Sequence, residues 1–437
     1  MSGPVGTPDS PAPDSPAPGN PASNTGARTP RLNVPEPGTR HGEALKFDDL
    51  AIEGYPAEPG GAERPPIDVE GWPIRKMSFS LIRVLDDEGN AVGPWAGSLT
   101  PEQLIEGLED MLLVRAFDAR MLRSQRQGKT SFYMQSLGEE AIACAHRKAL
   151  SPGDMNFPTY RQQGLLIADD YPLVTMINQI YSNRHDPMKG HQLPVMYSSK
   201  EHGFFTLSGN LATQYIQAVG WAMASAIRGD DKVASAWIGD GATAESDFHA
   251  GLVFASTYQA PVVLNIVNNQ WAISTFQGMA RGEVATFAAK GLGFGIPSLR
   301  VDGNDYLAVH AVSKWAVDRA RAGHGPTLIE WVTYRAGAHS TSDDPSAYRP
   351  AGEAAAWPLG DPIDRLCRHL VRIGAWDAER HAAAVEAAET AVREAEATAE
   401  SYGTLRSDDA ASPADIFDDL YAVAPPHIRR QRQQLGY

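Results

Sequence analysis

The sequence predicts an α/β protein with a mostly parallel sheet and helices on both of its faces. Between about residues 205 and 335, stretches with helical spacing alternate with short apolar stretches typical of strands. Strand, helix and strand in this order favour parallel strands joined by crossover helices. The chain of 437 residues, 43% of them hydrophobic, is long enough to bury a sizeable core.

The N-terminal part of the chain divides into two predicted segments. Residues 1–45 are rich in Pro, Ser, Gly and Ala, which predicts a disordered arm. Residues 46–99 are also rich in Pro and Gly but contain a strand-like stretch from Phe79 to Leu85, so we expect an extended, ordered segment. The main domain, residues 100–437, opens with a helix that has Pro101 in its first turn.

The main domain then continues as an alternation of helices and strands. We expect these elements in order: helix 211–228, strand 232–238, helix 244–258, strand 260–267, strand 298–303, helix 306–322 and strand 326–335. The Ala- and Glu-rich stretch 377–403 predicts a further helix with a structural role.

Composition excludes several classes of function. Thirty-eight basic against 53 acidic residues give a net charge of −15, which is poorly suited to binding a nucleic acid. The two cysteines, Cys144 and Cys367, lie far apart and form no metal-binding pair. No apolar run is long enough to span a membrane, and the start of the chain is unlike a targeting peptide. We therefore expect a cytoplasmic protein with no membrane partner.

The turn Gly239–Gly241, which reads GDG, follows the strand 232–238 and fits three kinds of structure. It could be a surface turn, the start of a dinucleotide site, or a phosphate anchor that carries a metal. A dinucleotide fingerprint needs an acidic residue after the next strand, but that strand ends in Asn268–Asn269. Asp240 can instead face a divalent cation while the N–H groups that follow it face a phosphate.

The ends of three predicted strands together indicate a magnesium site. Magnesium takes few protein oxygens and completes its shell with phosphates and water, so one carboxylate and one amide suffice. Asp240 supplies the carboxylate and Asn269 the amide, and the polar stretch 335–339 follows a third strand. Ligands of parallel sheets bind beyond these carboxyl ends.

The GDG turn followed by NN resembles the thiamine-diphosphate motif, which begins with GDG and ends with NN at about this separation. Other stretches resemble the alpha subunits of branched-chain 2-oxo acid dehydrogenase decarboxylating components, above all the bacterial ones: SFYMQSLGEEA, PTYRQQG, KGHQLPVMYS, TLSGNLATQ, VNNQWAIST, RVDGNDYLAV and GAHSTSDDPSAYRP. The resemblance runs from about Pro65 to the C-terminus. It implies a thiamine-diphosphate-binding fold, thiamine diphosphate and Mg²⁺ as cofactors, and decarboxylation of branched-chain 2-oxo acids with acyl transfer to a lipoyl group.

The resemblance also implies which residues form the site. The implied metal ligands are Asp240 and Asn269 through their side chains and Trp271 through its carbonyl. The implied cofactor contacts are Tyr160, Arg161, Gly209, Leu211, Gly241 and Ala242. His339 is the implied catalytic residue, because it contacts the diphosphate and acts on the substrate. A histidine in a polar loop is usually a solvated surface residue, but this one follows a predicted strand end.

Two further groups of residues have roles implied by the family. Phe132, Tyr160 and Leu211 would form the pocket for a branched side chain, although Phe132 fits a core position equally well. A potassium-binding loop of mammalian relatives matches Ser208, Asn210, Thr213 and Gln214. The chain departs from these relatives at Gly209–Asn210, where they have Ser-Pro, and at Val267, where they have a basic diphosphate contact.

The resemblance implies that this chain works with partners. In the family, the glutamate that activates the cofactor lies on a second domain, and this sequence shows no second sheet pattern that could carry it. We therefore expect a beta subunit in an alpha2-beta2 assembly and a lipoyl-bearing acyltransferase core. The alternatives are a pyruvate or acetoin dehydrogenase alpha subunit, a non-catalytic subunit of the same fold, and a nicotinamide oxidoreductase.

Overall fold

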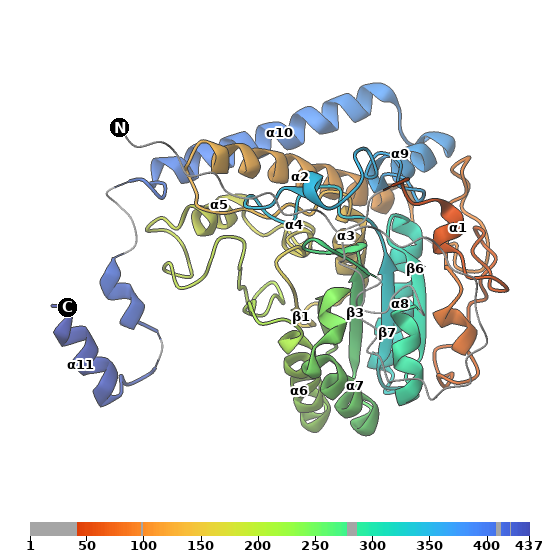
Figure 1. Ribbon diagram of the computed structural model, residues 1–437, viewed down its shortest axis with the longest axis horizontal. Helices are drawn as coiled ribbons and strands as arrows, with labels where there is room; N and C mark the ends of the chain where they lie inside the picture. The colour runs from red at the N-terminus through yellow and green to blue at the C-terminus, as the bar shows by residue number, and fades with distance from the viewer. Residues whose placement is uncertain (1–41, 98, 278–285, 408–411, 420) are drawn as a thin grey trace, which may run out of the picture. The chain divides into compact units, whose positions relative to one another are not determined.

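A computed structural model of the chain describes residues 42–97, 99–277, 286–407, 412–419 and 421–437. Its centre is a five-stranded, all-parallel sheet with the order β1-β2-β3-β7-β6 (Figure 1). The strands are β1 (Met155–Phe157), β2 (Ala234–Gly239), β3 (Val262–Asn268), β7 (Thr327–Val332) and β6 (Ser298–Asp302). The predicted α/β class is confirmed. Of the predicted disordered arm, 1–45, residues 1–41 lie outside the described residues.

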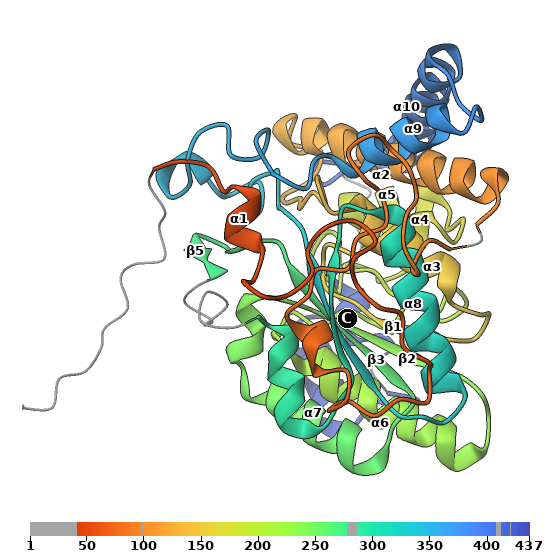
Figure 2. The same ribbon diagram turned by 90° about the vertical axis from the view of Figure 1, so that its right-hand side faces the viewer.

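Helices cover both faces of the sheet, as Figure 2 shows. One face packs against α6 (Thr213–Arg228) and α7 (Ser246–Tyr258), and the other against α3 (Glu140–Ala149) and α8 (Tyr306–Arg321). Further helices are α1 (Phe47–Leu50), α2 (Pro101–Arg126), α4 (Gly164–Ile167), α5 (Leu173–Tyr181), α9 (Pro362–Arg372), α10 (Ala378–Ser401) and α11 (Pro426–Gln434). Within the described ranges, no helix is both long and apolar enough to cross a membrane.

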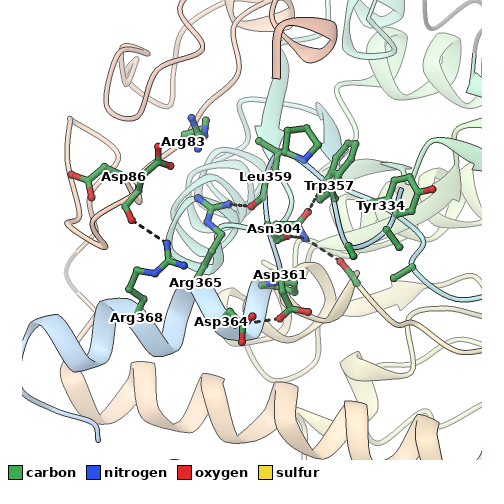
Figure 3. A pocket seen from close by; sticks show the side chains of 18 residues that line it. Arg83, Asp86, Asn304, Tyr334, Trp357, Leu359, Asp361, Asp364, Arg365 and Arg368 are labelled. Atoms are coloured by element: carbon green, nitrogen blue, oxygen red, sulfur yellow. Dashed lines mark hydrogen bonds between the residues drawn. The ribbon is translucent and has the colours of Figure 1, made fainter. Parts of the chain in front are cut away.

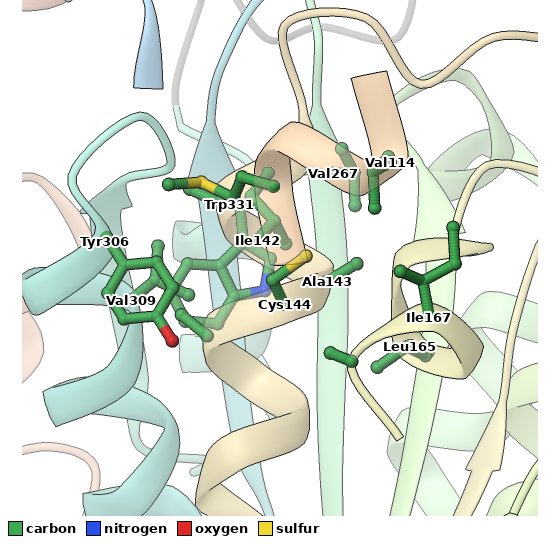
Figure 4. Close-up of a cluster of buried hydrophobic side chains, with 14 of the residues drawn as sticks. Val114, Ile142, Ala143, Cys144, Leu165, Ile167, Val267, Tyr306, Val309 and Trp331 are labelled. Atoms are coloured by element: carbon green, nitrogen blue, oxygen red, sulfur yellow. The ribbon is translucent and has the colours of Figure 1, made fainter. Parts of the chain in front are cut away.

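The hydrophobic core has two main parts, one on each face of the sheet, because side chains alternate between the two faces along each strand. In β2, Ala236 and Ile238 face the cluster built by α6 and α7, whereas Trp237 faces the cluster built by α2, α3 and α8. Successive side chains of a strand point to opposite faces, so each central strand supplies both clusters. Figure 4 shows the second cluster, where Ile142 and Cys144 of α3 lie between helices α2 and α8. Burial on both faces is typical of parallel sheets.

The described part of the segment 46–99 packs onto the edge of the sheet but forms no regular strand. Ile82 makes an isolated parallel bridge with Val301 of β6. The next backbone N–H groups, of Val84 and Leu85, both donate to the Asp305 carboxylate, at 2.8 and 2.6 Å. Because a side chain binds these donors, the pairing with β6 ends there. The predicted strand from Phe79 to Leu85 is reduced to this bridge and a second isolated bridge between Leu85 and Ala91.

The long helices match their predicted positions to within a few residues. Thr100 caps α2 and forms a reciprocal capping box with Gln103. The predicted helix start at Leu211 is wrong by two residues, because Ala212 has a left-handed backbone with φ +64°. The helix predicted from Ala244 begins at Ser246 as α7, after a short 3-10 turn from Gly241 to Ala244.

Candidate functional site

A cavity of about 440 Å³ lies at the carboxyl ends of β2 and β3. Its walls come from the loops after these strands, from the start of α6 and from two distant loops around residues 160 and 339. It brings together most of the residues predicted for the site: Tyr160, Arg161, Ser208, Gly209, Leu211, Gln214, Asp240, Gly241, Ala242, Asn269, Trp271 and His339.

Three of the predicted site residues do not line this cavity. Phe132 is partly buried against the hydrophobic core, which matches its alternative interpretation as a packing residue. Asn210 lies in the turn before α6, and Thr213 is the first residue of this helix; the Thr213 hydroxyl donates to the Asn210 carbonyl at 2.9 Å. The Thr213 side chain therefore closes the turn, and neither residue lines the cavity.

Asp240 holds a buried carboxylate at the floor of the cavity. The residue follows β2, and its side chain is 2% exposed. Its Oδ2 atom is buried without a hydrogen-bond partner. Burial, reinforced by the nearby Glu139 carboxylate, raises the pKa of Asp240 to about 7, against the opposing effects of the Gly241 N–H and Arg335. An isolated buried carboxylate oxygen is costly, so this arrangement favours a cation in the cavity.

Glu139 is a second buried carboxylate in the same cavity, and sequence reasoning missed it. Its Oε1 accepts from the Asn269 amide nitrogen at 2.7 Å and lies 4.0 Å from Nε of Arg161. Its Oε2 is buried without a partner. Burial raises the pKa of Glu139 although Arg161 and Asn269 oppose this shift. The quoted stretch SFYMQSLGEEA contains Glu139, but two adjacent glutamates give no local indication of which one faces a site.

Arg161 and His339 form a pair that fixes the state of the imidazole. Nη2 of Arg161 lies 3.0 Å from His339 Nδ1 and donates to the His339 carbonyl at 2.6 Å. A guanidinium only donates, so Nδ1 is the acceptor and the neutral ring carries its proton on Nε2. Burial, followed by the charges of Arg161 and Arg335, lowers the pKa of His339 to about 3. His339 is therefore a neutral imidazole at neutral pH.

Arg335 connects this pair to the loop after β3; the sequence placed it at a strand end beside the site but assigned it no role. It is 1% exposed, and its guanidinium donates to the carbonyls of Trp271 and Ile273 at 2.9 and 2.8 Å. It also donates to the Tyr348 hydroxyl at 2.7 Å. The carbonyl of Trp271, predicted as a metal ligand, thus already accepts one hydrogen bond and keeps a second lone pair.

The turn from Ser208 to Gln214, predicted as a potassium loop, is closed by its own hydrogen bonds. The Gln214 amide donates to the Ser208 carbonyl at 3.1 Å, and the Asn210 N–H donates to the Ser208 hydroxyl at 3.2 Å. Leu211 projects from this turn with 49% of its surface exposed. Val267, which stands where relatives have a basic residue, is a buried wall of the cavity.

A larger cavity of about 500 Å³, shown in Figure 3, contains none of the predicted site residues. Two of its arginines are bound to neighbouring protein atoms. Arg365 donates to the Asp302 carboxylate at 2.7 Å, and Arg368 donates to the Asp87 carbonyl at 3.0 Å. Because the smaller cavity contains buried carboxylate oxygens without a partner, it is the better candidate site.

This chain, with its parallel sheet, its acidic turn after β2 and its Arg161–His339 pair, belongs to the dehydrogenase E1 component family. The model of this family matches residues 109–407.

Individual relatives are similar over most of their length. The 2-oxoisovalerate dehydrogenase subunit alpha of Pseudomonas aeruginosa is 62% identical over 93% of this chain and 98% of its own length. The mitochondrial 2-oxoisovalerate dehydrogenase subunit alpha of Mus musculus is 40% identical over 82% of this chain and 79% of its own. The mitochondrial alpha 1 subunit of Arabidopsis thaliana is 37% identical over 81% of this chain and 74% of its own.

Proposed function

We propose that this chain is the alpha subunit of a thiamine diphosphate-dependent dehydrogenase that decarboxylates branched-chain 2-oxo acids and transfers the acyl group to a lipoyl acceptor. Membership of the dehydrogenase E1 component family and the 2-oxoisovalerate dehydrogenase relatives support this function and the cofactor. The observation that carries the proposal is the cavity that joins unpaired buried carboxylate oxygens to the Arg161–His339 pair.

The residues of the cavity fit a diphosphate held through magnesium. The available donors are oxygen atoms of Asp240, Asn269 and the Trp271 carbonyl, which is the ligand chemistry that magnesium prefers. Gly241 allows Ala272 to pack closely against the turn, because a Cβ at position 241 would lie 2.4 Å from the Cβ of Ala272. Arg161, and contacts from Tyr160, Gly209, Leu211 and Ala242, would hold the rest of the cofactor. Its thiazolium ring supplies the electron sink for decarboxylation.

His339 acts on the substrate in this proposal. Because Arg161 occupies Nδ1, the Nε2–H group is the part of the neutral imidazole left to donate a hydrogen bond to the substrate. Leu211 and Tyr160 line the same cavity and would contact the branched side chain. Phe132 would contribute to that pocket only indirectly, since it packs against the core.

A monovalent cation at Ser208, Asn210, Thr213 and Gln214 is a separate proposal. The carbonyls of Ser208 and Asn210 accept from side chains of the same turn, so potassium would share them with these donors. The buried Oε1 of Gln214, which has no partner, is one further oxygen that could bind the ion.

The chain is proposed to act with a beta subunit and a lipoyl-bearing core, and to be cytoplasmic. The word "alpha" in the names of its relatives supports a partner subunit. The glutamate that activates the cofactor would come from that partner. Full decarboxylase turnover by the purified chain alone would contradict this two-subunit proposal.

Calorimetry on the co-expressed alpha and beta subunits tests the cofactor. Thiamine diphosphate with Mg²⁺ is expected to bind and NADH is not. Binding of NADH instead would favour a nicotinamide oxidoreductase, and binding of neither would favour a non-catalytic subunit.

The substrate and His339 are tested by turnover of the same complex. 3-Methyl-2-oxobutanoate is expected to be preferred over pyruvate; the reverse preference would identify a pyruvate-type enzyme. His339→Ala is expected to leave cofactor binding largely intact and to abolish acyl transfer, and unchanged turnover would remove His339 from the chemistry.

A further inference from the structure

Glu139 occupies a position in the cavity that its place in the fold does not explain. It stands immediately before α3, yet its side chain makes no capping hydrogen bond to that helix. The structural contacts belong to its neighbour: Glu140 accepts from the Gly138 N–H at 2.9 Å and pairs with Arg115 at 2.9 Å. Glu139 is 3% exposed and directs its carboxylate toward Asn269 and Arg161 instead.

We propose that Glu139 is a positioning residue that fixes the Asn269 amide with its oxygen available to a divalent cation. This inference rests on the proposed function, because the cation is the one that the family implies. The carboxylate of Glu139 only accepts, so the amide nitrogen of Asn269 must face it. The Asn269 oxygen is then the atom left toward the cavity, where it accepts from the Trp271 N–H at 3.3 Å.

The cavity contains two buried carboxylate oxygens that have no hydrogen-bond partner. They are Oε2 of Glu139 and Oδ2 of Asp240, and both residues line the cavity. Two uncompensated carboxylate oxygens in one buried cavity repel each other and favour a cation nearby. The ion pair with Arg161 links the same carboxylate to the group proposed to hold the diphosphate. Glu139 thus connects the metal side of the site to its phosphate side.

The test measures how much Mg²⁺ the co-expressed complex needs to bind thiamine diphosphate, by calorimetry and without substrate. Glu139→Ala is expected to raise the apparent Mg²⁺ dissociation constant by about tenfold or more, the effect of losing a hydrogen bond to a charged group. Glu139→Gln is expected to give a smaller increase, because its oxygen still accepts from Asn269. Glu245→Gln is the matched control, since Glu245 is exposed and outside the cavity.

A double-mutant comparison separates positioning from a general structural role. If Glu139 acts through Asn269, then Glu139→Ala/Asn269→Ala should bind Mg²⁺ no more weakly than Asn269→Ala alone. Additive losses, or a Glu139→Ala complex that binds Mg²⁺ as the wild type does, would overturn the inference. If Glu139→Ala does not assemble, Glu139→Asp replaces it, because the shorter side chain withdraws the acceptor. Wild-type complex that binds no thiamine diphosphate would instead refute the proposed function.

Discussion

Arg161 controls the protonation of His339 through both a hydrogen bond and its charge. Its guanidinium donates to Nδ1, and Nη1 of a second cation, Arg335, lies 3.5 Å from the same nitrogen. A proton on Nδ1 would have to displace this hydrogen bond and would face two positive charges. The imidazole is therefore held neutral, with its proton on the nitrogen that remains free for the substrate.

Replacing Arg161 by Met is expected to raise the pKa of His339 from about 3 toward its ordinary value. The substitution removes the charge of Arg161, which after burial is the main cause of the lowered pKa. Histidine Cε1–H resonances of the cofactor-free protein, titrated with acid, measure this shift. His146, whose pKa depends on burial and on other cations, is the internal control. An unchanged titration of His339 would contradict the role of Arg161.

His146 gives the fold a dependence on pH that is separate from catalysis. Its ring lies in the core between two hydroxyl groups, with Nε2 2.7 Å from Ser235 Oγ and Nδ1 2.9 Å from Ser313 Oγ. Burial, with smaller effects of Arg147 and His310, lowers its pKa to about 3. The unfolded chain binds a proton at this residue near pH 6.5, and the folded chain does not.

Stability is therefore expected to fall as the pH falls below about 6.5, by up to about 1.4 kcal/mol per pH unit from His146 alone. The sign follows because the unfolded state binds the additional proton over this range. His146→Gln should lose stability overall but should lose less of it on acidification than the wild type. Urea unfolding at neutral pH and near pH 5.5 measures both slopes, and equal slopes would exclude His146 as the cause.

At the scale of the residue, the sequence was sufficient to predict the acidic turn and Asn269. It was not sufficient to predict the side chains that hold these residues in place. Asp240 and Asn269 follow strands that are recognisable by their apolar composition, so their proximity could be predicted. Glu139 reaches the cavity from a loop distant in sequence, and Arg335 contacts the loop after β3, so their contacts form only when these segments pack. The sequence marks Arg335 only as part of a polar strand end, and nothing near Glu139 marks that residue in advance.

At the scale of the element, helix starts were predictable because they depend on local chemistry. Thr100 and Asp377 each cap a long helix through hydrogen bonds within a few residues. The order of the strands is different: β7 inserts between β3 and β6, which depends on how crossovers pack. The short strand Met155–Phe157 was missed because three residues are too few to show a period.

The helix α10 packs on α2 and α5 through small apolar side chains and places one buried carboxylate between them. Glu396 is 1% exposed and accepts from Ser124 at 2.6 Å, from Tyr181 at 2.7 Å and from Arg120. Lys129 donates to it as well, at 3.2 Å. Figure 1 shows the result, with α10 lying along α2. One side chain thus connects α10 to both α2 and α5.

Glu396→Ala is expected to destabilise the chain by about 1–3 kcal/mol, because it removes the acceptor of the buried Ser124 and Tyr181 hydroxyls, while Arg120 and Lys129 are partly exposed. Thermal unfolding of the isolated chain measures the loss. Glu394→Ala is the matched control, since this side chain lies on the same helix and is exposed. A loss no larger than that of Glu394→Ala would show that packing of α10, and not this carboxylate, attaches the helix.

At the scale of the whole molecule, the outer sides of α6 and α7 carry large apolar side chains exposed to solvent. Ile227 is 84% exposed, Tyr258 59% and Phe254 51%, and the rings of Phe254 and Tyr258 stack at 5.8 Å. Both helices pack on the sheet beside the strand that carries Asp240. Clusters of exposed aromatic and aliphatic groups are typical of protein interfaces. These three side chains lie toward the C-terminal ends of α6 and α7, whereas the cavity lies at the starts of these helices, so a partner that also completes the cavity would have to cover the outer side along the helices.

Phe254→Glu combined with Tyr258→Glu is expected to weaken assembly with the beta subunit by about tenfold or more, because buried aromatic side chains contribute most to such interfaces. The dissociation constant of the co-expressed pair, from sedimentation velocity, measures the effect. Val371→Glu on α9 is the matched control, since Val371 is 50% exposed against 51% for Phe254. Both substitutions should leave thermal unfolding of the isolated chain nearly unchanged, since the side chains are already half in solvent. Assembly as tight as that of the wild type would mean that the partner covers a different face.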